Sequence, residues 1–153
     1  MKYIILENIR SAYNVGAIFR TADATGVTKV FLTGYTPAPV DRFGRPQPEI
    51  EKTSLGASKT TPWEKVDSIA ALIVRLQNEG ATVVAVELAE GSVPLKEFIE
   101  PEHVAYIVGN EIDGVSKEVL ELADVIVELP MLGQKESLNV SVTAGVILYH
   151  GLT

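Results

Sequence analysis

The sequence lacks the side chains on which several kinds of site depend. It has no cysteine, and its two histidines, His103 and His150, stand far apart. The absence of thiols excludes disulfides, thiol nucleophiles and thiolate metal sites, and it fits the reducing cytoplasm, where we expect the protein to work. Two isolated histidines predict no metal centre.

Long apolar stretches are missing as well. No run approaches the roughly 18 residues that a membrane helix needs. Glu7 interrupts the apolar N-terminal segment too early for a signal peptide. The 153 residues, 46% of them hydrophobic, suit one compact domain. We therefore expect a single domain over residues 1–153 and no membrane partner.

Basic charge is scarce and unevenly placed. The net charge is −7, but residues 1–77 hold ten Lys and Arg against seven Asp and Glu, whereas residues 78–153 hold three against thirteen. This balance argues against a chain that coats nucleic acid over its whole surface. The basic half fits contact with a polyanion through one face, although acidic helices could equally serve only to keep the protein dissolved.

Short apolar runs alternate with segments of helical spacing. Runs rich in β-branched residues predict buried strands at Tyr3–Glu7, Lys29–Thr33, Thr82–Glu87, Val104–Val108 and Asp124–Leu129. Helical spacing is found at Val15–Thr25, Asp67–Glu79, Lys117–Leu122 and Val140–Leu148, the second with Asp67 or Ser68 as its N-cap. The alternation predicts an α/β fold, with a mostly parallel sheet and helices on both faces. Ligands of such sheets bind at the carboxyl ends of the strands.

The segment Tyr35–Pro62 departs from this alternation. It is rich in proline, and it carries the basic residues Arg42, Arg45, Lys52 and Lys59. We expect a long loop here, and loops of this length inside a compact domain are usually functional or disordered.

A first polar constellation follows the first predicted strand. Asn14 stands in the loop that opens a helix, and Arg20 follows six residues later beside apolar neighbours. The guanidinium of Arg20 is permanently charged and donates in pairs, so it could bind an anion. Taken singly, an N-capping asparagine and a surface arginine explain both residues without any ligand.

A second constellation follows the strand that ends at Val108. Gly109-Asn110-Glu111 leads to a second turn glycine and to Ser116, the predicted N-cap of a short helix. Gly109 would let a ligand approach the backbone closely. Glu111 cannot cradle phosphate, so a cationic or neutral ligand fits better, although such turns are also common without a ligand.

The third constellation opens the last predicted helix. The loop from Leu129 runs into Ser137-Leu138-Asn139, and the small residues Ser141, Ala144 and Gly145 follow. Small residues permit close packing against the sheet or against another subunit. A capped C-terminal helix explains Ser137 or Asn139, but not both together with this face.

In this order the three constellations resemble the signature motifs of the SpoU family of RNA 2′-O-methyltransferases. Asn14 and Arg20 match its Asn…Arg pair, Gly109-Asn110-Glu111 its Gly-Asn-Glu, and Ser137-Leu138-Asn139-Val140 its Ser-Leu-Asn-Val. The resemblance implies a SPOUT fold, whose C-terminal segment forms a deep trefoil knot. It also implies S-adenosylmethionine (SAM) as cofactor, bound by Leu88, Ala89, Val108, Gly109, Asn110, Leu129, Pro130, Met131, Ser137 and Leu138.

The resemblance further implies methylation of a ribose 2′-hydroxyl in RNA, with tRNA favoured over rRNA, by a homodimer. Arg20 is the expected catalytic residue, and Asn14 assists it. Glu111 and Asn139 are expected to position groups or to face the substrate, and no metal is involved. The alternative is a non-catalytic SAM- or RNA-binding subunit that needs a partner. Many relatives carry an RNA-binding extension, and we expect none in residues 1–153.

Overall fold

The computed structural model describes residues 1–153, and a single seven-stranded sheet forms its centre. All strand pairs are parallel, in the order β3-β2-β1-β6-β4-β7-β5. The strands are β1 (Lys2–Glu7), β2 (Lys29–Thr33), β3 (Trp63–Val66), β4 (Thr82–Val86), β5 (Val93–Pro94), β6 (Val104–Val108) and β7 (Val125–Glu128). The α/β class and the mostly parallel sheet are thereby confirmed.

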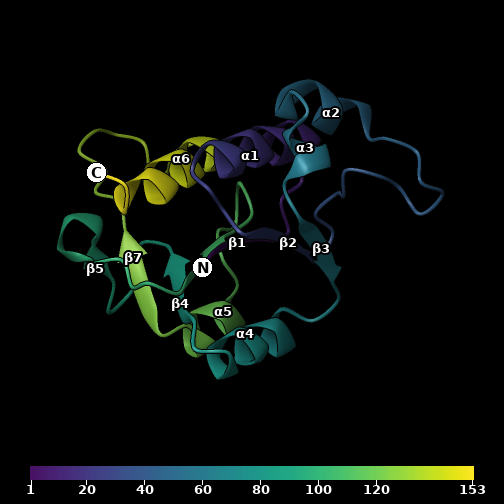
Figure 1. Cartoon of the computed structure of the whole chain (residues 1–153). Helices are drawn as coiled ribbons and strands as arrows, with labels where there is room; N and C mark the ends of the chain where they lie inside the picture. Colours follow the sequence, from purple (N-terminus) through teal and green to yellow (C-terminus); the bar gives the residue numbers. More distant parts are fainter.

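Helices cover both faces of this sheet (Figure 1). One face carries α1 (Ala12–Ala24), α2 (Pro48–Ser54), α3 (Ala57–Thr60) and α6 (Val140–His150), and the other carries α4 (Ile69–Asn78) and α5 (Lys117–Leu122). A single 3-10 turn, η1 (Leu95–Glu97), completes the elements. No helix is long and apolar enough to cross a membrane.

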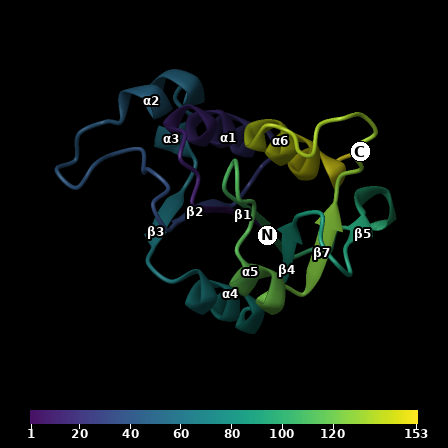
Figure 2. The same cartoon turned by 180° about the vertical axis from the view of Figure 1, so that it is seen from behind.

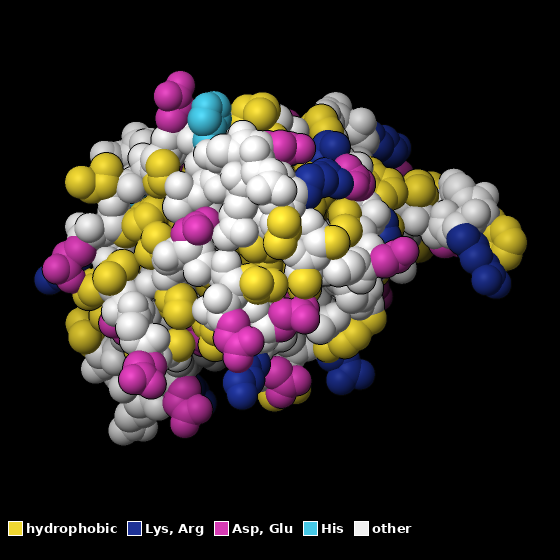
Figure 3. Space-filling view, turned by 90° about the horizontal axis from the view of Figure 1, so that it is seen from below, with side chains coloured by type: hydrophobic (Ala, Val, Ile, Leu, Met, Phe, Trp, Pro, Cys, Tyr) yellow, Lys and Arg dark blue, Asp and Glu magenta, His cyan; other side chains and the backbone are white.

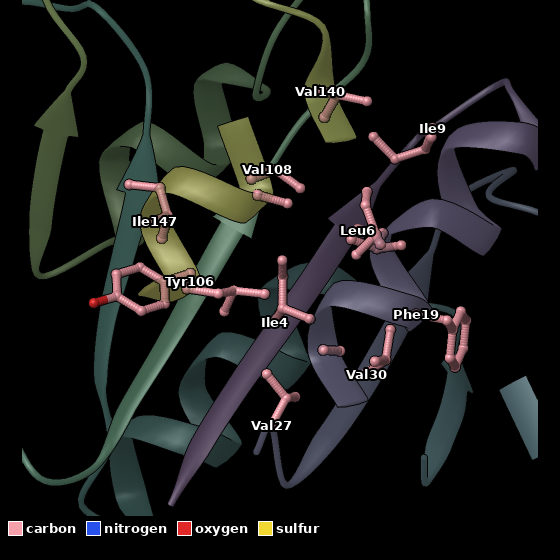
Figure 4. Packing of buried hydrophobic residues seen from close by; sticks show 14 of the residues in the cluster. Ile4, Leu6, Ile9, Phe19, Val27, Val30, Tyr106, Val108, Val140 and Ile147 are labelled. Atoms are coloured by element: carbon pink, nitrogen blue, oxygen red, sulfur yellow. The ribbon is translucent and has the colours of Figure 1, made fainter. Parts of the chain in front are cut away.

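Alternation along the central strands divides the core into two layers. In β1, Ile4 and Leu6 belong to the cluster beneath α1 and α6, whereas Tyr3 and Ile5 face α4 and α5. Successive side chains of a strand point to opposite faces, so each central strand supplies both layers. Figure 4 shows the first layer, where Ile4 and Tyr106 of the sheet pack with Ile147 of α6.

The central strand β1 is paired on both sides with distant parts of the chain. Ile4 is the register partner of Val30 in β2 and of Tyr106 in β6. At the edge of this pairing, the Nζ of Lys2 lies 3.0 Å from the carboxylate of Glu100, which also accepts a hydrogen bond from Tyr106. The chain therefore joins its first strand to residues about a hundred positions later.

Serine side chains cap the N-termini of the two helices on the second face of the sheet. The side chain of Ser68 accepts from the N–H of Ala71 and begins α4, and Ser116 does the same for Val119 in α5. Both serines satisfy N–H groups that a helix leaves without an internal partner. The N-caps predicted at these two positions are confirmed.

The predicted long loop at Tyr35–Pro62 is wrong for its second half, where α2 and α3 form. Pro48 occupies the first turn of α2, where the missing N–H costs nothing. Ile50 is fully buried against α1, so tertiary packing stabilises a helix that is too short to show a clear period. Strands β3 and β5 and turn η1 were also not predicted, because each is short.

Helices α1 and α2 pack closely at Gly16. A Cβ placed there would lie 2.7 Å from the carbonyl oxygen of Ile50 and would collide with the hydroxyl of Thr53. That hydroxyl also donates to the carbonyl of Tyr13, at 3.0 Å. The glycine thus sets the distance between the two helices.

We expect Gly16→Ala to push α2 away from α1 and to lower the free energy of unfolding by about 1–3 kcal/mol, the usual cost of overpacking. Urea denaturation followed by circular dichroism measures it. Gly133→Ala is the control, because a Cβ at Gly133 has no atom within 4 Å. Equal stability of the two variants would contradict this account of the contact.

Candidate functional site

A cleft lies at the carboxyl edge of the sheet, beyond the ends of β4, β6 and β7. Its volume is about 260 Å³, near the lower end of the roughly 300–1,000 Å³ of small-molecule sites. It is lined by Val86, Glu87, Leu88, Val108, Gly109, Asn110, Glu111, Ile112, Asp113, Gly114, Leu129, Met131, Glu136, Ser137, Leu138, Val140 and Thr143.

The cleft brings together most residues expected to hold a cofactor. Of the ten, Ala89 and Pro130 do not line it. The others do, and they come from the ends of three strands and from the loop before α6: Leu88, Val108, Gly109, Asn110, Leu129, Met131, Ser137 and Leu138. Three segments far apart in sequence thus meet at one place.

Asn110 is the most fully engaged polar side chain of the site. Its Oδ1 accepts from the N–H groups of Ile112 and Asp113, both at 2.8 Å. Its Nδ2 donates to the carbonyl of Asn8 at 2.9 Å and to the hydroxyl of Tyr35 at 2.6 Å. Asn110 therefore shapes its own turn and ties it to the ends of β1 and β2.

Glu111 joins the second motif to the first. Its carboxylate accepts from the backbone N–H groups of Arg10 (2.9 Å) and Ser11 (3.0 Å) and from the Nδ2 of Asn14 (3.1 Å). Partial burial on its own raises the pKa of Glu111, but these hydrogen bonds outweigh it, and the net pKa lies below the ordinary value. At neutral pH the carboxylate of Glu111 is therefore ionised, and both of its oxygens already accept hydrogen bonds from the chain.

Another carboxylate, that of the buried Glu7, links the end of β1 to the start of α5 in a similar way. The Oε1 and Oε2 of Glu7, at the end of β1, accept from the backbone N–H (2.8 Å) and the hydroxyl (2.6 Å) of Ser116, the N-cap of α5. Glu7 is only 4% exposed. The ends of β1 and β6 are thus fixed to each other on both faces of the sheet.

Gly109 is needed for a reason that the sequence did not reveal. We expected its missing Cβ to admit a ligand, but a Cβ there would collide with the backbone of Gly114 and Val115. The turn that follows the Gly-Asn-Glu motif folds back onto Gly109, and Asn110 and Gly114 form a bridge that closes it. Close packing of the chain on itself therefore requires this glycine.

The electrostatics of the cleft select its ligands. Glu87, Glu111, Asp113 and Glu136 line it, and no lysine, arginine or histidine does. Apolar side chains supply much of the remaining wall. An anionic phosphate would be repelled here, whereas a cation with an apolar, planar part would fit.

The third motif contributes to the cleft in two ways. Ser137 and Leu138 line it directly. Asn139 does not, because it is the N-cap of α6 and its Oδ1 accepts from the N–H (2.9 Å) and hydroxyl (2.6 Å) of Ser141. Asn139 therefore fixes the direction in which α6 leaves the site.

Asn14 and Arg20 are separated by the fold. Asn14 contacts Glu111 at the edge of the cleft, as described above. Arg20, six residues further along α1, is exposed and lines no part of the cleft, and its side chain forms no hydrogen bond or ion pair. Within one chain, the expected catalytic arginine and the expected cofactor residues do not meet.

The two histidines lie away from the cleft. The Nδ1 of His103 is 2.9 Å from the N-terminal nitrogen, and the Nε2 of His150 is 2.7 Å from the carbonyl oxygen of Phe98. No group of three or more His, Asp or Glu side chains is arranged to hold a metal ion.

Sequence reasoning missed Glu87, Asp113 and Glu136 as lining residues. Glu87 directly follows β4, and its carboxylate accepts from the N–H groups of Leu88 and Val115, both at 3.1 Å. Its place after a strand was a usable signal, since ligands bind at that end. Glu136 lies in a loop without any periodic pattern and carried no such signal.

Comparison with known proteins identifies relatives over nearly the whole chain. A family model described as the SpoU rRNA Methylase family matches residues 1–149. A 23S rRNA (guanosine-2′-O-)-methyltransferase of Neisseria meningitidis is 34% identical over 95% of this chain and 55% of its own length. A tRNA (guanosine(18)-2′-O)-methyltransferase of Aquifex aeolicus is 36% identical over 95% of this chain and 66% of its own length. The chain thus spans between half and two thirds of these relatives.

Solved structures share the fold. The TrmH/SpoU tRNA modifying enzyme of A. aeolicus has a TM-score of 0.85 at 33% identity, over 98% of this chain and 73% of the other. An AdoMet-bound rRNA methyltransferase from Sinorhizobium meliloti has a TM-score of 0.85 at 28% identity, over 98% and 55%. A structure described as giving insight into 2-OH methylation of C/U34 on tRNA has a TM-score of 0.84 at 28% identity, over 99% and 94%.

We expect Glu111→Gln to lower the free energy of unfolding at pH 7 by about 1–3 kcal/mol, because an amide replaces an ionised acceptor. A carboxyl whose pKa is lowered by folding stabilises above its unfolded pKa, about 4.3, and loses this contribution as the pH falls through the folded value. The difference from wild type should therefore shrink below about pH 4. Denaturation at a series of pH values measures this.

Glu121→Gln, an exposed position on α5 without a hydrogen bond, is the control and should leave the pH profile unchanged. If Glu111→Gln and wild type differ by the same amount at pH 3 and pH 7, the carboxylate does not make the link as an anion.

Proposed function

The chain belongs to the SpoU family of RNA methylases, and from this premise we propose that it is a SAM-dependent RNA ribose 2′-O-methyltransferase. The observation that carries the proposal is the acidic cleft without a basic side chain, joined through Glu111 and Asn14 to the helix that bears Arg20. SAM is a cation with a planar purine whose faces can pack on apolar side chains, and this is the ligand chemistry that the cleft favours.

The residues of the cleft fit the cofactor. When bound, SAM supplies a methyl group activated by its sulfonium. Glu87, Asp113 and Glu136 give the cleft the negative charge that a sulfonium and an amino group favour. Leu88, Leu129, Met131 and Leu138 supply apolar wall for the adenine, with Val108, Gly109, Asn110 and Ser137 between them. Ala89 and Pro130 adjoin these residues in the sequence, and we propose that they bind the cofactor through their backbone groups.

Arg20 is the proposed catalytic residue. In the transfer, the ribose oxygen would bond to the methyl carbon as the methyl–sulfur bond breaks, and S-adenosylhomocysteine would leave. The hydroxyl would give up its proton, so negative charge would develop on its oxygen. The guanidinium of Arg20 is permanently charged and therefore a poor base, so its role is to hold a flanking phosphate and to stabilise the forming oxyanion. The phosphate or a water receives the proton. Asn14 and Glu111 fix the start of α1, and Asn139 fixes the start of α6.

The separation of Arg20 from its own cleft supports a homodimer. Helix α6 lies beside α1 and exposes Val142, Val146 and Tyr149, so it is apolar on its outer side as well as its buried side. Helices that are apolar all round are usually buried. We propose that this face pairs with a second copy, whose cleft then receives Arg20.

The proposal includes a trefoil knot and a single methyltransferase domain over residues 1–153. The knot is proposed because the resemblance to the SpoU family implies it. Helix α5 lies on one face of the sheet and α6 on the other, and the segment between β7 and α6 passes along the cleft at the carboxyl edge.

Transfer RNA is the proposed substrate class. Among the similar proteins, those named for tRNA include one whose own length this chain nearly matches. The alternative is a subunit that binds SAM or RNA without catalysis, which the net charge of −7 favours. Methylation of tRNA from cells that lack the gene, assayed with purified protein and labelled SAM, distinguishes the two.

We expect Arg20→Ala to lower the single-turnover methylation rate by at least about 10²–10³-fold, because a donor to the developing charge is lost. SAM binding, measured by calorimetry, and dimerisation should stay near wild type, because Arg20 belongs neither to the residues proposed to hold SAM nor to the apolar face of α6. Arg20→Lys should restore little, since a point charge lacks the planar fork.

Lys117→Ala, at an exposed and unpaired cation on α5 across the sheet, is the control and should methylate normally. A normal rate for Arg20→Ala would refute the catalytic assignment. Loss of SAM binding or of the dimer in Arg20→Ala would make Arg20 a structural residue.

We expect Val146→Glu to convert the dimer to a 16.5 kDa monomer and to abolish methylation, because it buries a charge in the proposed interface. Val74→Glu on α4 is the control, as the two valines are 42% and 46% exposed. Sedimentation velocity at micromolar concentration measures the assembly. A wild-type chain that sediments as a monomer would overturn the proposed dimer.

A further inference from the structure

The segment between β2 and α2 projects from the molecule as an arm, which we define as residues 39–47. Figures 1 and 2 both show it standing away from the body. Every residue from Val40 to Pro46 is exposed. Burial in the core therefore contributes nothing to the shape of the chain between Val40 and Pro46, whereas Pro39, where the arm begins, is buried.

Hydrogen bonds hold the arm in one shape instead. Val40 and Pro46 form an antiparallel bridge, and the carboxylate of Asp41 accepts from the backbone N–H groups of Phe43 (2.8 Å) and Arg45 (3.0 Å). The same carboxylate accepts from the Nε of Arg45 at 2.8 Å. Gly44 supplies the positive φ of +78° that the turn requires. The turn at the tip is thus shaped by hydrogen bonds within the arm itself.

The tip presents one aromatic ring and two cations. Phe43 is 67% exposed, and the guanidinium carbons of Arg42 and Arg45 lie 4.8 Å and 5.0 Å from its ring centroid. Arg45 is paired with Asp41, whereas Arg42 has no ion pair. Figure 3 shows the resulting group of basic and hydrophobic side chains at the end of the projection.

This combination fits one class of partner better than others. A phenyl ring and a guanidinium plane both stack on nucleobases, and a guanidinium also binds phosphate in a bidentate way. An apolar protein surface would use the ring but would have to desolvate both arginines. The pair of cations stands out because the chain as a whole carries a net charge of −7.

The arm is also connected to the cleft. Tyr35, at the base of the segment, is 57% exposed, and its hydroxyl bonds to Asn110, which lines the cleft. The Nζ of Lys65 donates to the carbonyls of Gly34 (2.9 Å) and Thr36, and these hydrogen bonds fix the chain on both sides of Tyr35. An RNA strand on the tip could continue past Tyr35 towards the reacting ribose.

We propose that the arm is an RNA-binding element that stacks an unpaired nucleotide on Phe43 and Arg42. The inference rests on the proposed function, because it assigns a binding surface for the RNA of that reaction. The arm adds affinity and selects RNA with an unpaired base at a fixed distance from the methylated ribose.

The test is binding of an unmodified tRNA transcript to the full chain in the absence of SAM, measured by fluorescence anisotropy at several salt concentrations. Phe43→Leu keeps an apolar side chain but removes the ring, and it should weaken binding about tenfold. Phe43→Trp should bind like wild type or more tightly. Arg42→Gln should lower the slope of log affinity against log salt by about one. Ile99→Ala, at an 89% exposed apolar residue outside the arm and cleft, is the control and should change nothing.

Methylation kinetics supply a second readout. In Phe43→Leu the KM for tRNA should rise about tenfold while kcat and SAM affinity stay at wild-type values. Equal affinity of Phe43→Leu and wild type for the transcript would overturn the proposal, and so would a change of oligomeric state in Phe43→Leu, which would make the arm a contact between copies. Absence of methylation by wild type would sink the proposed function alone, because the binding comparison does not use SAM.

Discussion

The carboxylate of Glu111 is the interaction on which the arrangement of the site depends. It accepts from two backbone N–H groups ahead of α1 and from Asn14 within that helix. A carboxylate that accepts several hydrogen bonds fixes both position and orientation, because each donor constrains it from a different direction. The start of α1 is therefore set by the end of β6. The position of Arg20 follows from that start, and so does the contact between α1 and α6.

Acidic and basic side chains lie in different parts of the molecule. All charged side chains that line the cleft are carboxylates, whereas the arm and α1 carry arginines without buried partners. An acidic cleft attracts a cationic cofactor and repels phosphate, so a polyanion is kept from occupying the cofactor site. The same sorting is consistent with the proposed binding of RNA by a chain of overall negative charge, since only a few positive groups at the right edge are needed.

The sequence was sufficient for the regular part of the fold and for the three motifs. Five strands were predicted because each is a short apolar run, and Lys29–Thr33 and Val104–Val108 agree with the observed bounds. The helices α2 and α3 were missed because Pro48 and neighbouring turn residues hide a helix held mainly by Ile50. Glu136 was missed because the fold, rather than any spacing, brings it to the cleft, whereas the place of Glu87 directly after a strand was a signal that went unused. The distance between Arg20 and its own cleft could not be seen in a linear pattern either.

The pairing of β1 with β6 has a consequence for the synthesis of the chain. The first strand leaves the ribosome about a hundred residues before its partner, as the register of Lys2 with Val104 requires. Until then one side of β1 presents unpaired N–H and C=O groups of an apolar strand, a template for wrong pairing. Contacts between residues this distant in sequence also slow folding. The intervening chain must lose conformational entropy to bring the two strands together before their pairing can stabilise the fold. The protein is therefore expected to be most prone to aggregation while it is still nascent.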